Sequence, residues 1–531
     1  MEFLDRGTYR LDPVHPPLAR LAIALPLYIA GKRYPALPDS DADSRDYNVV
    51  GNHILYDDGH WLRNIILARI GVLPFFILGA IIVHRWTSRL SGNLAAVMAV
   101  FLYCTTPTVL AFSSIAYTDI VAAATQLTAL FAFSLWLDRR DWRRSLWLGA
   151  ALGLALLAKM TTLLFIPASV TFMLVAWLLP RRREFSWRRI DWRLIGRLAT
   201  VGCIATLIVW AGYRFSVRPL QEATGISPAA MPSFQHFPRP LRATARSLVL
   251  RNPRLPAPEL LHGIALAWAL NSSTSQTYLF GHIQRRGWWY FYLVALGVKL
   301  PLSFLLLFVA SIFVIAARGP RAGGHDVERS VFLPLSALAA ILLVTMHVSY
   351  QVGVRHVMVA FPLMAILAGV GSATFVVDRS WSLVARWAVV ALLATQLIES
   401  ASAQSDFLSY FNTLAAKDPS RVLVMGCDLD CGQDVLRLAA ELHSRHISRC
   451  ALLIWSSADT EHSGLPPDAQ PDAQGRYQGW IALSARAARM GDVLHESFSP
   501  GRFAWLEHYQ PVAKVGNTIR LFYVGERRDS H

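Results

Sequence analysis

The sequence predicts a predominantly α-helical, polytopic membrane protein of about ten transmembrane helices, with a small C-terminal α/β domain outside the cytoplasm. Of its 531 residues, 54% are hydrophobic and 16% are charged, whereas soluble domains average about 25% charged residues. The mean hydropathy is +0.37. The apolar residues fall in blocks, and several blocks are long enough to cross a hydrocarbon core, which takes about 20 residues.

The candidate spans are roughly 65–84, 93–112, 118–137, 145–159, 162–179, 197–213, 289–316, 331–347, 354–377 and 387–400. Two of them, 145–159 and 162–179, form one apolar stretch that is interrupted around Lys159. We expect two short helices there, meeting at a polar turn near one membrane surface.

The connecting loops give these spans one consistent orientation. Two connections, 113–117 and 348–353, contain no Lys or Arg. The alternate connections are rich in Arg: 85–92, 138–144, 180–196, 317–330 and 378–386. Short basic loops face the cytoplasm. We therefore expect a multi-pass protein of the cell inner membrane.

This orientation divides the chain into three parts. Residues 1–64 form an external loop with a short interfacial helix, 65–400 form the membrane domain with a long external loop at 214–288, and 401–531 form a periplasmic domain. The apolar stretch Leu18–Ala30 has 13 residues, too few to span. Because no signal peptide or span precedes residues 1–64, we expect either an additional helix upstream or an unusual mode of insertion.

The net charge of +16 does not indicate a nucleic-acid partner, because most Arg residues lie in short clusters between apolar blocks, where they orient a membrane protein. The five cysteines show no metal-ligand spacing. Cys427, Cys431 and Cys450 lie in the exported tail, where a disulfide is permitted. The sequence does not select a pair among them.

The tail is expected to be a small α/β domain. Residues 421–426 look like a buried strand, and 433–445 have helical periodicity with Val435, Leu436, Leu438, Ala439 and Leu442 on one face. Residues 451–455 form a second short apolar run, so 421–455 is interpreted as a βαβ unit. Residues 480–484 are a third strand candidate.

Two groups of candidate site residues precede or open predicted helices. His15 comes before Pro16 and Pro17, and paired prolines favour the first turn of a helix. Tyr117 and Asp119 follow an uncharged external turn. A capping role would explain His15 and Asp119. A carboxylate at the outer end of a buried membrane helix is also typical of a functional site.

The remaining candidates are cations and aromatic residues. Lys159 ends an apolar helix, where either snorkelling or an anionic headgroup explains it, and Lys299 lies about two turns into another. Arg355 and His356 open a span. An aromatic belt at the interface explains a further set: Trp288, Trp289 and Tyr290.

All these groups fall on one predicted side of the membrane. Together they supply a carboxylate, several cations and aromatic rings. A lipid-phosphate substrate that enters from the bilayer requires Arg or Lys for its phosphate and a carboxylate for acid/base chemistry.

The order of these motifs resembles that of the membrane-embedded GT-C glycosyltransferases of the protein O-mannosyltransferase and aminoarabinose-transferase type. The tail segment Asp428–Asp434 is similar to the Asn-Leu-Asp-Trp-Gly-Gln-Asp element of many bacterial members. The resemblance covers nearly the whole chain. The other motifs on which it rests are His15-Pro16-Pro17-Leu18-Ala19, Thr118-Asp119, Gly153-Leu154-Ala155-Leu156-Leu157-Ala158-Lys159, Gly287-Trp288-Trp289-Tyr290, Val298-Lys299-Leu300-Pro301 and Gly353-Val354-Arg355-His356.

The chain departs from the family pattern at two places. The family has an Asp-Glu pair in the first external loop, shortly before the His-Pro-Pro element, and this Asp is its leading candidate for the catalytic base. The sequence begins inside that loop, so we expect either a start site placed too far downstream or a truncated, inactive member. Cys431 stands where the family usually has Trp.

The resemblance implies transfer of a sugar, with inversion, from a polyprenyl-phosphate donor in the membrane to a hydroxyl of a protein, glycolipid or glycan. Asp119 is expected to assist or orient the reaction. No cofactor or metal is required, because cations neutralise the leaving group, although a divalent metal is compatible with the pattern. The donor phosphate is expected to contact Lys159, Lys299, Arg355 and His356. The site lining is expected to include His15, Pro16, Pro17, Tyr117, Trp288, Trp289 and Tyr290.

Three other functions are weighed. A flippase of lipid-linked sugars predicts internal repeats and helices broken at the midplane, and the sequence shows no convincing repeat. A membrane anchor for a soluble enzyme predicts a catalytic tail, but the tail has no glycine-rich phosphate loop or nucleophile motif. A nucleotide-sugar transferase would use Asp428 and Asp430 as an Asp-X-Asp metal site, but nucleotide sugars are not expected on the outer face, and loops at strand ends are commonly rich in Asp.

Overall fold

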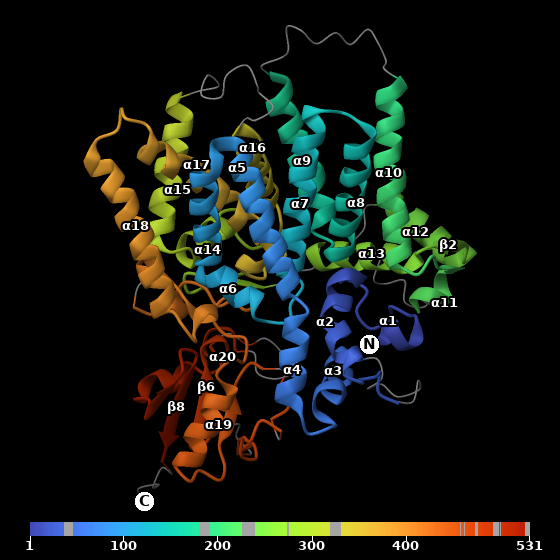
Figure 1. The fold of residues 1–531 in the computed structure, drawn as a ribbon. Helices are drawn as coiled ribbons and strands as arrows, with labels where there is room; N and C mark the ends of the chain where they lie inside the picture. Colours follow the sequence, from blue (N-terminus) through green and yellow to red (C-terminus); the bar gives the residue numbers. More distant parts are fainter. Residues whose placement is uncertain are drawn as a thin grey trace, which may run out of the picture.

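The computed structural model describes most of the chain. The described ranges are 1–36, 46–179, 192–225, 239–272, 276–318, 331–415, 417–456, 458–460, 462–472, 476–491, 499 and 501–525. A bundle of apolar helices forms the larger part, and the N-terminal segment and the C-terminal domain lie together at one end of it (Figure 1).

The helices of the bundle follow the predicted spans closely. Side chains cap several of them: Asp141 accepts a hydrogen bond from the Arg144 N–H, and Ser382 accepts one from the Ala385 N–H. The helices are α4 (Trp61–Ile70), α5 (Leu73–Cys104), α6 (Pro107–Ser113), α7 (Asp119–Asp138), α8 (Trp142–Ala158), α9 (Thr162–Leu178), α10 (Trp192–Gly212), α14 (Phe291–Lys299), α15 (Leu302–Arg318), α16 (Phe332–Thr345), α17 (Ala360–Val377) and α18 (Leu383–Ser402).

Five described segments are long and apolar enough to cross a membrane, and α14 with α15 makes a sixth if the two are counted as one span. The protein is therefore a multi-pass membrane protein. The expected number of about ten is larger because it included shorter apolar helices such as α9 and α16. The five long segments are Trp61–Cys104, α7, α10, α17 and α18.

Two breaks interrupt the helices of the bundle. Ser91 and Gly92 have non-helical backbone angles inside α5, and they divide it where the sequence predicts a connection at 85–92. The predicted span 289–316 is two helices, α14 and α15, bent by 119° at Leu300-Pro301. Pro301 has no N–H for the helix ladder and favours an extended residue before it, so the helix stops and restarts in a new direction.

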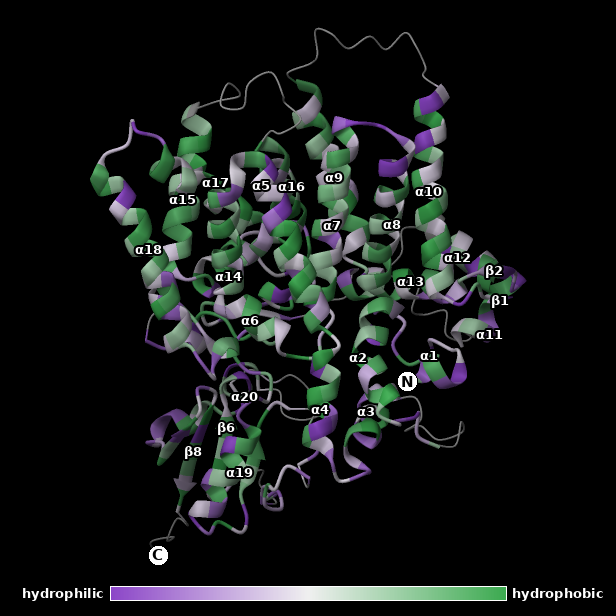
Figure 2. Ribbon diagram, viewed as in Figure 1, coloured by the Kyte–Doolittle hydropathy of each residue, from purple (hydrophilic) through white to green (hydrophobic). Residues whose placement is uncertain are grey.

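Helices α7 and α17 form the centre of the bundle. In their most apolar windows, 83% and 78% of the residues are buried, compared with 17% in α10 and α18. The outer helices therefore expose their apolar residues, and Figure 2 shows that the helices of the bundle are mostly hydrophobic along their length. This arrangement is expected where lipid surrounds the protein.

The α7–α8 and α17–α18 connections lie at the end of the bundle opposite the C-terminal domain (Figure 1). The first contains Arg139 and Arg140, and the second contains Arg379. Two further Arg-rich connections, 180–196 and 317–330, fall mostly outside the described residues.

The N-terminal segment forms α1 (Glu2–Arg6), α2 (Pro17–Ile29) and α3 (Tyr47–Tyr56). Helix α2 begins at Pro17 after an N-cap at Pro16, as the paired prolines predict. The long loop 214–288 contains two short antiparallel pairs, β1 (Val217–Pro219) with β2 (Arg254–Pro256) and β3 (Thr277–Leu279) with β4 (His282–Gln284). It also contains three helices: α11 (Leu220–Thr224), α12 (Arg239–Arg251) and α13 (Pro258–Ser272).

The C-terminal domain is built on a four-stranded sheet of order β5-β6-β8-β7. Strands β5 and β6 are parallel, with Leu452 opposite Ala482, and the other pairs are antiparallel. Its elements are α19 (Val435–Ser444), β5 (Ala451–Leu453), β6 (Gly479–Ser484), α20 (Ala485–Met490), η10 (Ala504–His508), β7 (Ala513–Val515) and β8 (Ile519–Val524).

The predicted strand at 421–426 is wrong, and with it the βαβ unit at 421–455. Residues 419–421 form a short 3-10 helix, and no strand follows before α19. Val422, Leu423, Val424 and Met425 are buried in the same hydrophobic core as the membrane helices. The apolar run thus reflects contact with the bundle, and a short buried run does not by itself distinguish a strand from other buried segments.

Candidate active site

The structure brings four of the predicted groups together: the start of α7, the end of α8, the turn before α17 and the segment before α2. An ion pair joins Lys159 to Asp119. The positive charges of Lys159 and Arg355 both act on His356, and His15 is near enough to affect it as well. These residues are far apart in the sequence, and they meet where the C-terminal loop 427–431 contacts the bundle.

The ion pair between Lys159 and Asp119 is the best-buried charged contact of this group. Asp119 is the first residue of α7, and Lys159 ends α8 with an extended backbone. Asp119 is 1% exposed and Lys159 is 8% exposed. Within the described part of the chain, Asp119 Oδ2 has no hydrogen-bond partner. Because buried polar atoms are nearly always paired, this oxygen indicates a place where a ligand completes the site.

Arg355 stands beside this pair. Its guanidinium lies 5.0 Å from the centre of the Tyr117 ring, a cation–π contact. The negative charge of Asp119 also stabilises the guanidinium. Arg355 Nε is buried and has no hydrogen-bond partner among the described residues. Two cations, Lys159 and Arg355, are thus held close to one carboxylate, with donor and acceptor atoms left unused.

Two histidines complete this side of the site. Tyr292 Oη lies 3.3 Å from His356 Nδ1. His15 Nδ1 lies 2.8 Å from Asp12 Oδ2, which fixes the ring and turns its Nε2 away from the carboxylate. Burial opposes ionisation of Asp12, but its contacts with His15 and Arg20 hold the pKa of this carboxyl below its ordinary value.

Lys299 is placed differently from the other cations. Its Nζ donates to three backbone carbonyls, those of Leu408 at 2.8 Å, Tyr410 at 2.8 Å and Asp428 at 2.6 Å. An ammonium group has three N–H bonds, so this structure leaves none for a phosphate. Lys299 instead ties the bent end of α14 to the segment that leads into the C-terminal domain.

The aromatic motif is also fixed by backbone contacts. The Gln351 side chain accepts a hydrogen bond from the Trp288 N–H and donates one to the Trp288 carbonyl. Trp289 is 62% exposed and packs edge-to-face on Tyr290. This exposure suits an interfacial ring better than contact with the buried ion pair.

Asp428 contributes a carboxylate that sequence reasoning placed only in an accessory element. It is fully buried and accepts the Val354 N–H at 2.9 Å, directly before Arg355. Gly353 has φ of +93°, and a Cβ there would lie 2.5 Å from Asp428 Oδ2, so only glycine fits. Burial raises the pKa of Asp428 to about 7, and the Lys299 charge opposes this rise.

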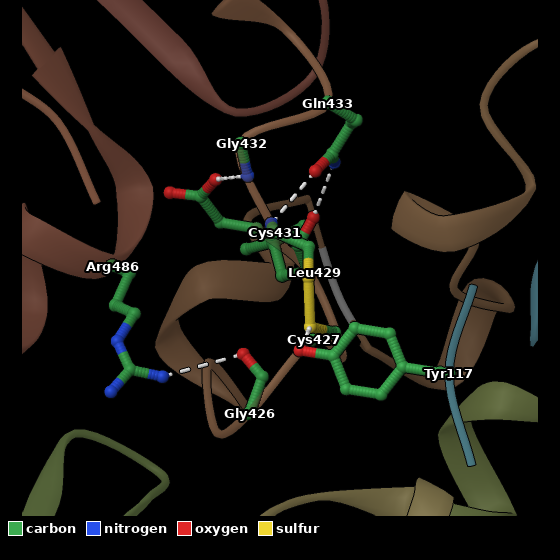
Figure 3. The surroundings of a disulfide bond; sticks show 9 residues. Tyr117, Gly426, Cys427, Leu429, Cys431, Gly432, Gln433 and Arg486 are labelled. Atoms are coloured by element: carbon green, nitrogen blue, oxygen red, sulfur yellow. Dashed lines mark hydrogen bonds between the residues drawn. A yellow bond between two sulfur atoms is a disulfide. The ribbon is translucent and has the colours of Figure 1, made fainter. Parts of the chain in front are cut away.

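A disulfide between Cys427 and Cys431 closes the loop that contains Asp428 (Figure 3). The Tyr117 hydroxyl lies 3.5 Å from Cys427 Sγ. Gln433 braces the same loop, because its side chain accepts the Cys431 N–H and donates to the Leu429 carbonyl. The structure thereby chooses a pair that the sequence left open, and Cys450 is a free, buried thiol.

The two aspartates of the loop do not form a metal site together. Asp430 Oδ1 accepts the Gly432 N–H, whereas Asp428 accepts from Val354. Across the part of the chain that the structure describes, no group of three or more His, Cys, Asp or Glu residues is placed to hold a metal ion.

Residues 64–210 match the family model described as dolichyl-phosphate-mannose-protein mannosyltransferase. The matched region includes Asp119 and Lys159. The match is confined to residues 64–210, and within them it agrees with the family resemblance drawn from the motifs.

Among solved structures, one match is ArnT from Cupriavidus metallidurans bound to undecaprenyl phosphate, with 15% identity, 97% of this chain and 94% of that chain covered, and a TM-score of 0.42. Another is the archaeal oligosaccharyltransferase AglB from Archaeoglobus fulgidus in complex with an inhibitory peptide and a dolichol-phosphate. Its identity is 13%, the coverage is 90% of this chain and 66% of that chain, and the TM-score is 0.44. No curated protein matches the chain significantly.

Proposed function

We propose that the protein transfers a sugar from a polyprenyl-phosphate donor to an acceptor hydroxyl at the outer face of the cytoplasmic membrane, with inversion. The observation that supports this most is the buried group of Lys159, Asp119 and Arg355, which has unused hydrogen-bonding atoms. The undecaprenyl phosphate and dolichol-phosphate named for the two similar structures agree with a lipid-linked donor.

Lys159 and Arg355 bind the phosphate of the donor in this proposal. A guanidinium presents paired N–H donors that fit phosphate oxygens, and an ammonium adds a compact charge. As the bond from the anomeric carbon to the phosphate oxygen breaks, negative charge grows on the phosphate, and both cations stabilise it. Asp119 positions Lys159 for this role, and His356 lies beside them.

His15 is the proton acceptor we propose from the described residues. Asp12 holds its Nδ1 and leaves Nε2 free. The acceptor O–H gives its proton to Nε2, and the oxygen forms a bond to the anomeric carbon. The polyprenyl phosphate leaves with the bonding electrons from the opposite side, so the configuration inverts.

The side of the membrane follows from charge. The two short described connections that contain Arg, α7–α8 and α17–α18, lie at the end of the bundle opposite the C-terminal domain. The long loop 214–288 also contains Arg, but loops of more than about 60 residues do not follow the charge rule. If the two short connections face the cytoplasm, then the site, which contacts the C-terminal loop, opens on the periplasmic side.

The test is a transfer assay on the full chain in lipid nanodiscs, with a polyprenyl-phosphate sugar as donor and release of polyprenyl phosphate as the readout. Lys159→Met and Arg355→Met should each lower the rate at least a hundredfold, while Arg445→Met, at an exposed position directly after α19, should leave it unchanged. His15→Gln should lower the rate with little change in donor affinity.

Two outcomes would contradict the proposal. One is full activity in Lys159→Met and Arg355→Met. The other is movement of the labelled donor across the bilayer without release of polyprenyl phosphate, which would identify a flippase.

A further inference from the structure

The C-terminal domain contains a cavity of about 480 Å³ beside the segment 409–421, which follows α18. Several regions line it: the segment 409–421, Leu429, the end of β6, helix α20, the segment 503–511, and the strands β7 and β8 with the turn between them. Pockets that bind small ligands have volumes of roughly 300 to 1,000 Å³. The cavity therefore has room for a group of the size of one or two sugar rings.

The cavity shares a wall with the candidate active site. Leu429 lines the cavity, and its neighbour Asp428 points to Val354 beside Arg355. Phe411 also lines the cavity, and its ring lies 4.4 Å from Lys299 Nζ. The disulfide-closed loop thus separates the two sites, so a molecule bound in the cavity would lie next to the site where the donor phosphate is proposed to bind.

Positive charge dominates the lining. Five Lys and Arg residues face two carboxylates, Asp418 and Glu507. Three arginines surround the Asp418 carboxylate. The distances to its Oδ2 are 3.0 Å from Arg489, 3.6 Å from Arg421 and 3.7 Å from Arg520. One carboxylate cannot neutralise three guanidinium groups, so the cavity keeps an excess of positive charge.

Two of these arginines remain accessible to a ligand. Arg489 is engaged, because it also contacts Glu507 at 3.1 Å and Ser420 at 3.2 Å. In contrast, the side chains of Arg421 and Arg520 are 73% and 54% exposed. Their distances to Asp418 are those of loose ion pairs, which contribute little when exposed, so both can turn to an incoming anion.

The ionisation of the Asp418 carboxyl is consistent with this arrangement of arginines. Burial opposes its ionisation, but Ser420, Arg489 and Arg520 lower the pKa of Asp418 below its ordinary value. It therefore stays ionised and holds the arginines in place. Aromatic rings from Phe503 and Tyr509 also line the cavity, and they offer apolar faces for a sugar ring.

We propose that this cavity binds a phosphorylated saccharide of the acceptor, with Arg421 and Arg520 on the phosphate and the aromatic residues beside the sugar. The inference rests on the proposed transferase function for the identity of the ligand as acceptor. A neutral saccharide would leave the excess charge uncompensated, whereas the planar guanidinium groups suit phosphate oxygens.

The test measures binding directly, by isothermal titration calorimetry on the full chain in nanodiscs, with glucose 6-phosphate as the probe and no donor present. Glucose and inorganic phosphate serve as comparison ligands. Glucose 6-phosphate should bind at least tenfold more tightly than either of them. The variant Arg421→Ser/Arg520→Ser should weaken its binding at least tenfold, while Arg445→Ser, at an exposed charge directly after α19, should not change it.

Three results would overturn the proposal: no binding of glucose 6-phosphate, equal binding of inorganic phosphate, or unchanged binding in the double variant. A thermal unfolding curve for each variant shows whether the domain remains folded. Because this assay contains no donor, its result does not depend on sugar transfer, and failure of the transferase proposal is recognised separately by the nanodisc transfer assay.

Discussion

Two buried lysines at the ends of apolar helices, Lys159 and Lys299, look alike in the sequence and differ completely in the structure. Each is close to an aspartate, Asp119 in the first case and Asp428 in the second. Lys159 contacts one carboxylate oxygen, and the other oxygen of Asp119 has no partner among the described residues. Lys299 donates to three backbone carbonyls, and Asp428 directs its carboxylate to the Val354 N–H.

The difference teaches how to distinguish a structural cation from a functional one. A buried charge is tolerated only where it is paired and hydrogen-bonded. Lys299 meets this condition through contacts within the protein alone. The Lys159 region meets it incompletely, and Arg355 beside it also has an unpaired Nε. Incomplete hydrogen bonding in a buried group is what a ligand site requires before its ligand arrives.

The largest expected effect is on stability at Lys299. Lys299→Met removes three hydrogen bonds from a charged donor and leaves three carbonyls with no such partner, at a cost of roughly 5 kcal/mol. We expect a large fall in the midpoint of thermal unfolding in detergent and faster proteolysis between α18 and the C-terminal domain. Lys514→Met, at an exposed position, is the control and should change stability by no more than about 0.5 kcal/mol. A stable Lys299→Met variant would refute the structural assignment.

The next effect separates the two roles at Lys159. Lys159→Met alone leaves Asp119 as an unpaired buried charge and should cost about 3 to 5 kcal/mol. The double variant Lys159→Met/Asp119→Leu replaces the pair with apolar groups, so it should regain most of this stability. It should remain inactive in the transfer assay, because the lysine that binds the donor phosphate is lost. A stable and active double variant would show that the pair serves structure only.

A smaller effect concerns pH and Asp430, in the same loop as Asp428. Burial raises the pKa of Asp430 to about 6. A carboxyl whose pKa is higher in the folded state stabilises the fold fully below its ordinary pKa of about 4, and this contribution is lost as the pH rises through about 6. Asp430→Asn should therefore match the parent at pH 4 and exceed it by about 3 kcal/mol at pH 8. Parallel curves of stability against pH for the two proteins would contradict this.

The smallest effect is expected for Arg355→Lys. The charge remains, but the planar contact with Tyr117 and the paired N–H donors are lost. We expect kcat/KM for the donor to fall about tenfold to a hundredfold, which corresponds to about 1.4 to 2.7 kcal/mol, with a change in the unfolding midpoint of less than about 2 °C. A fall in stability as large as that of Lys299→Met would place Arg355 with the structural cations.

Much of the helical architecture was predictable from the sequence. The spans agree because an apolar block of sufficient length has few alternatives to a membrane helix. The start of α2 agrees because proline restricts the backbone locally. Four of the five residues predicted for the buried face of α19 are buried, and Leu436 is the exception, since it is exposed.

Other features required contacts that periodicity does not encode. Residues 422–425 looked like a strand because they are apolar, but they pack against the membrane helices. The pairing of Cys427 with Cys431 and the contact of Asp12 with His15 depend on local turns that the sequence did not specify. The role of Asp428 depends on Gly353, which lies 75 residues earlier and makes room for its carboxylate.

The sequence by itself determined that this is a polytopic membrane protein with a C-terminal α/β domain, and its motifs showed a resemblance to the GT-C type. These conclusions depend on the length and composition of segments, which act locally. Only the tertiary structure decided which buried cation is free to serve a substrate. The carbonyls that saturate Lys299 come from residues 109 to 129 positions later in the chain, so its hydrogen bonding exists only once the C-terminal segment has packed against the bundle.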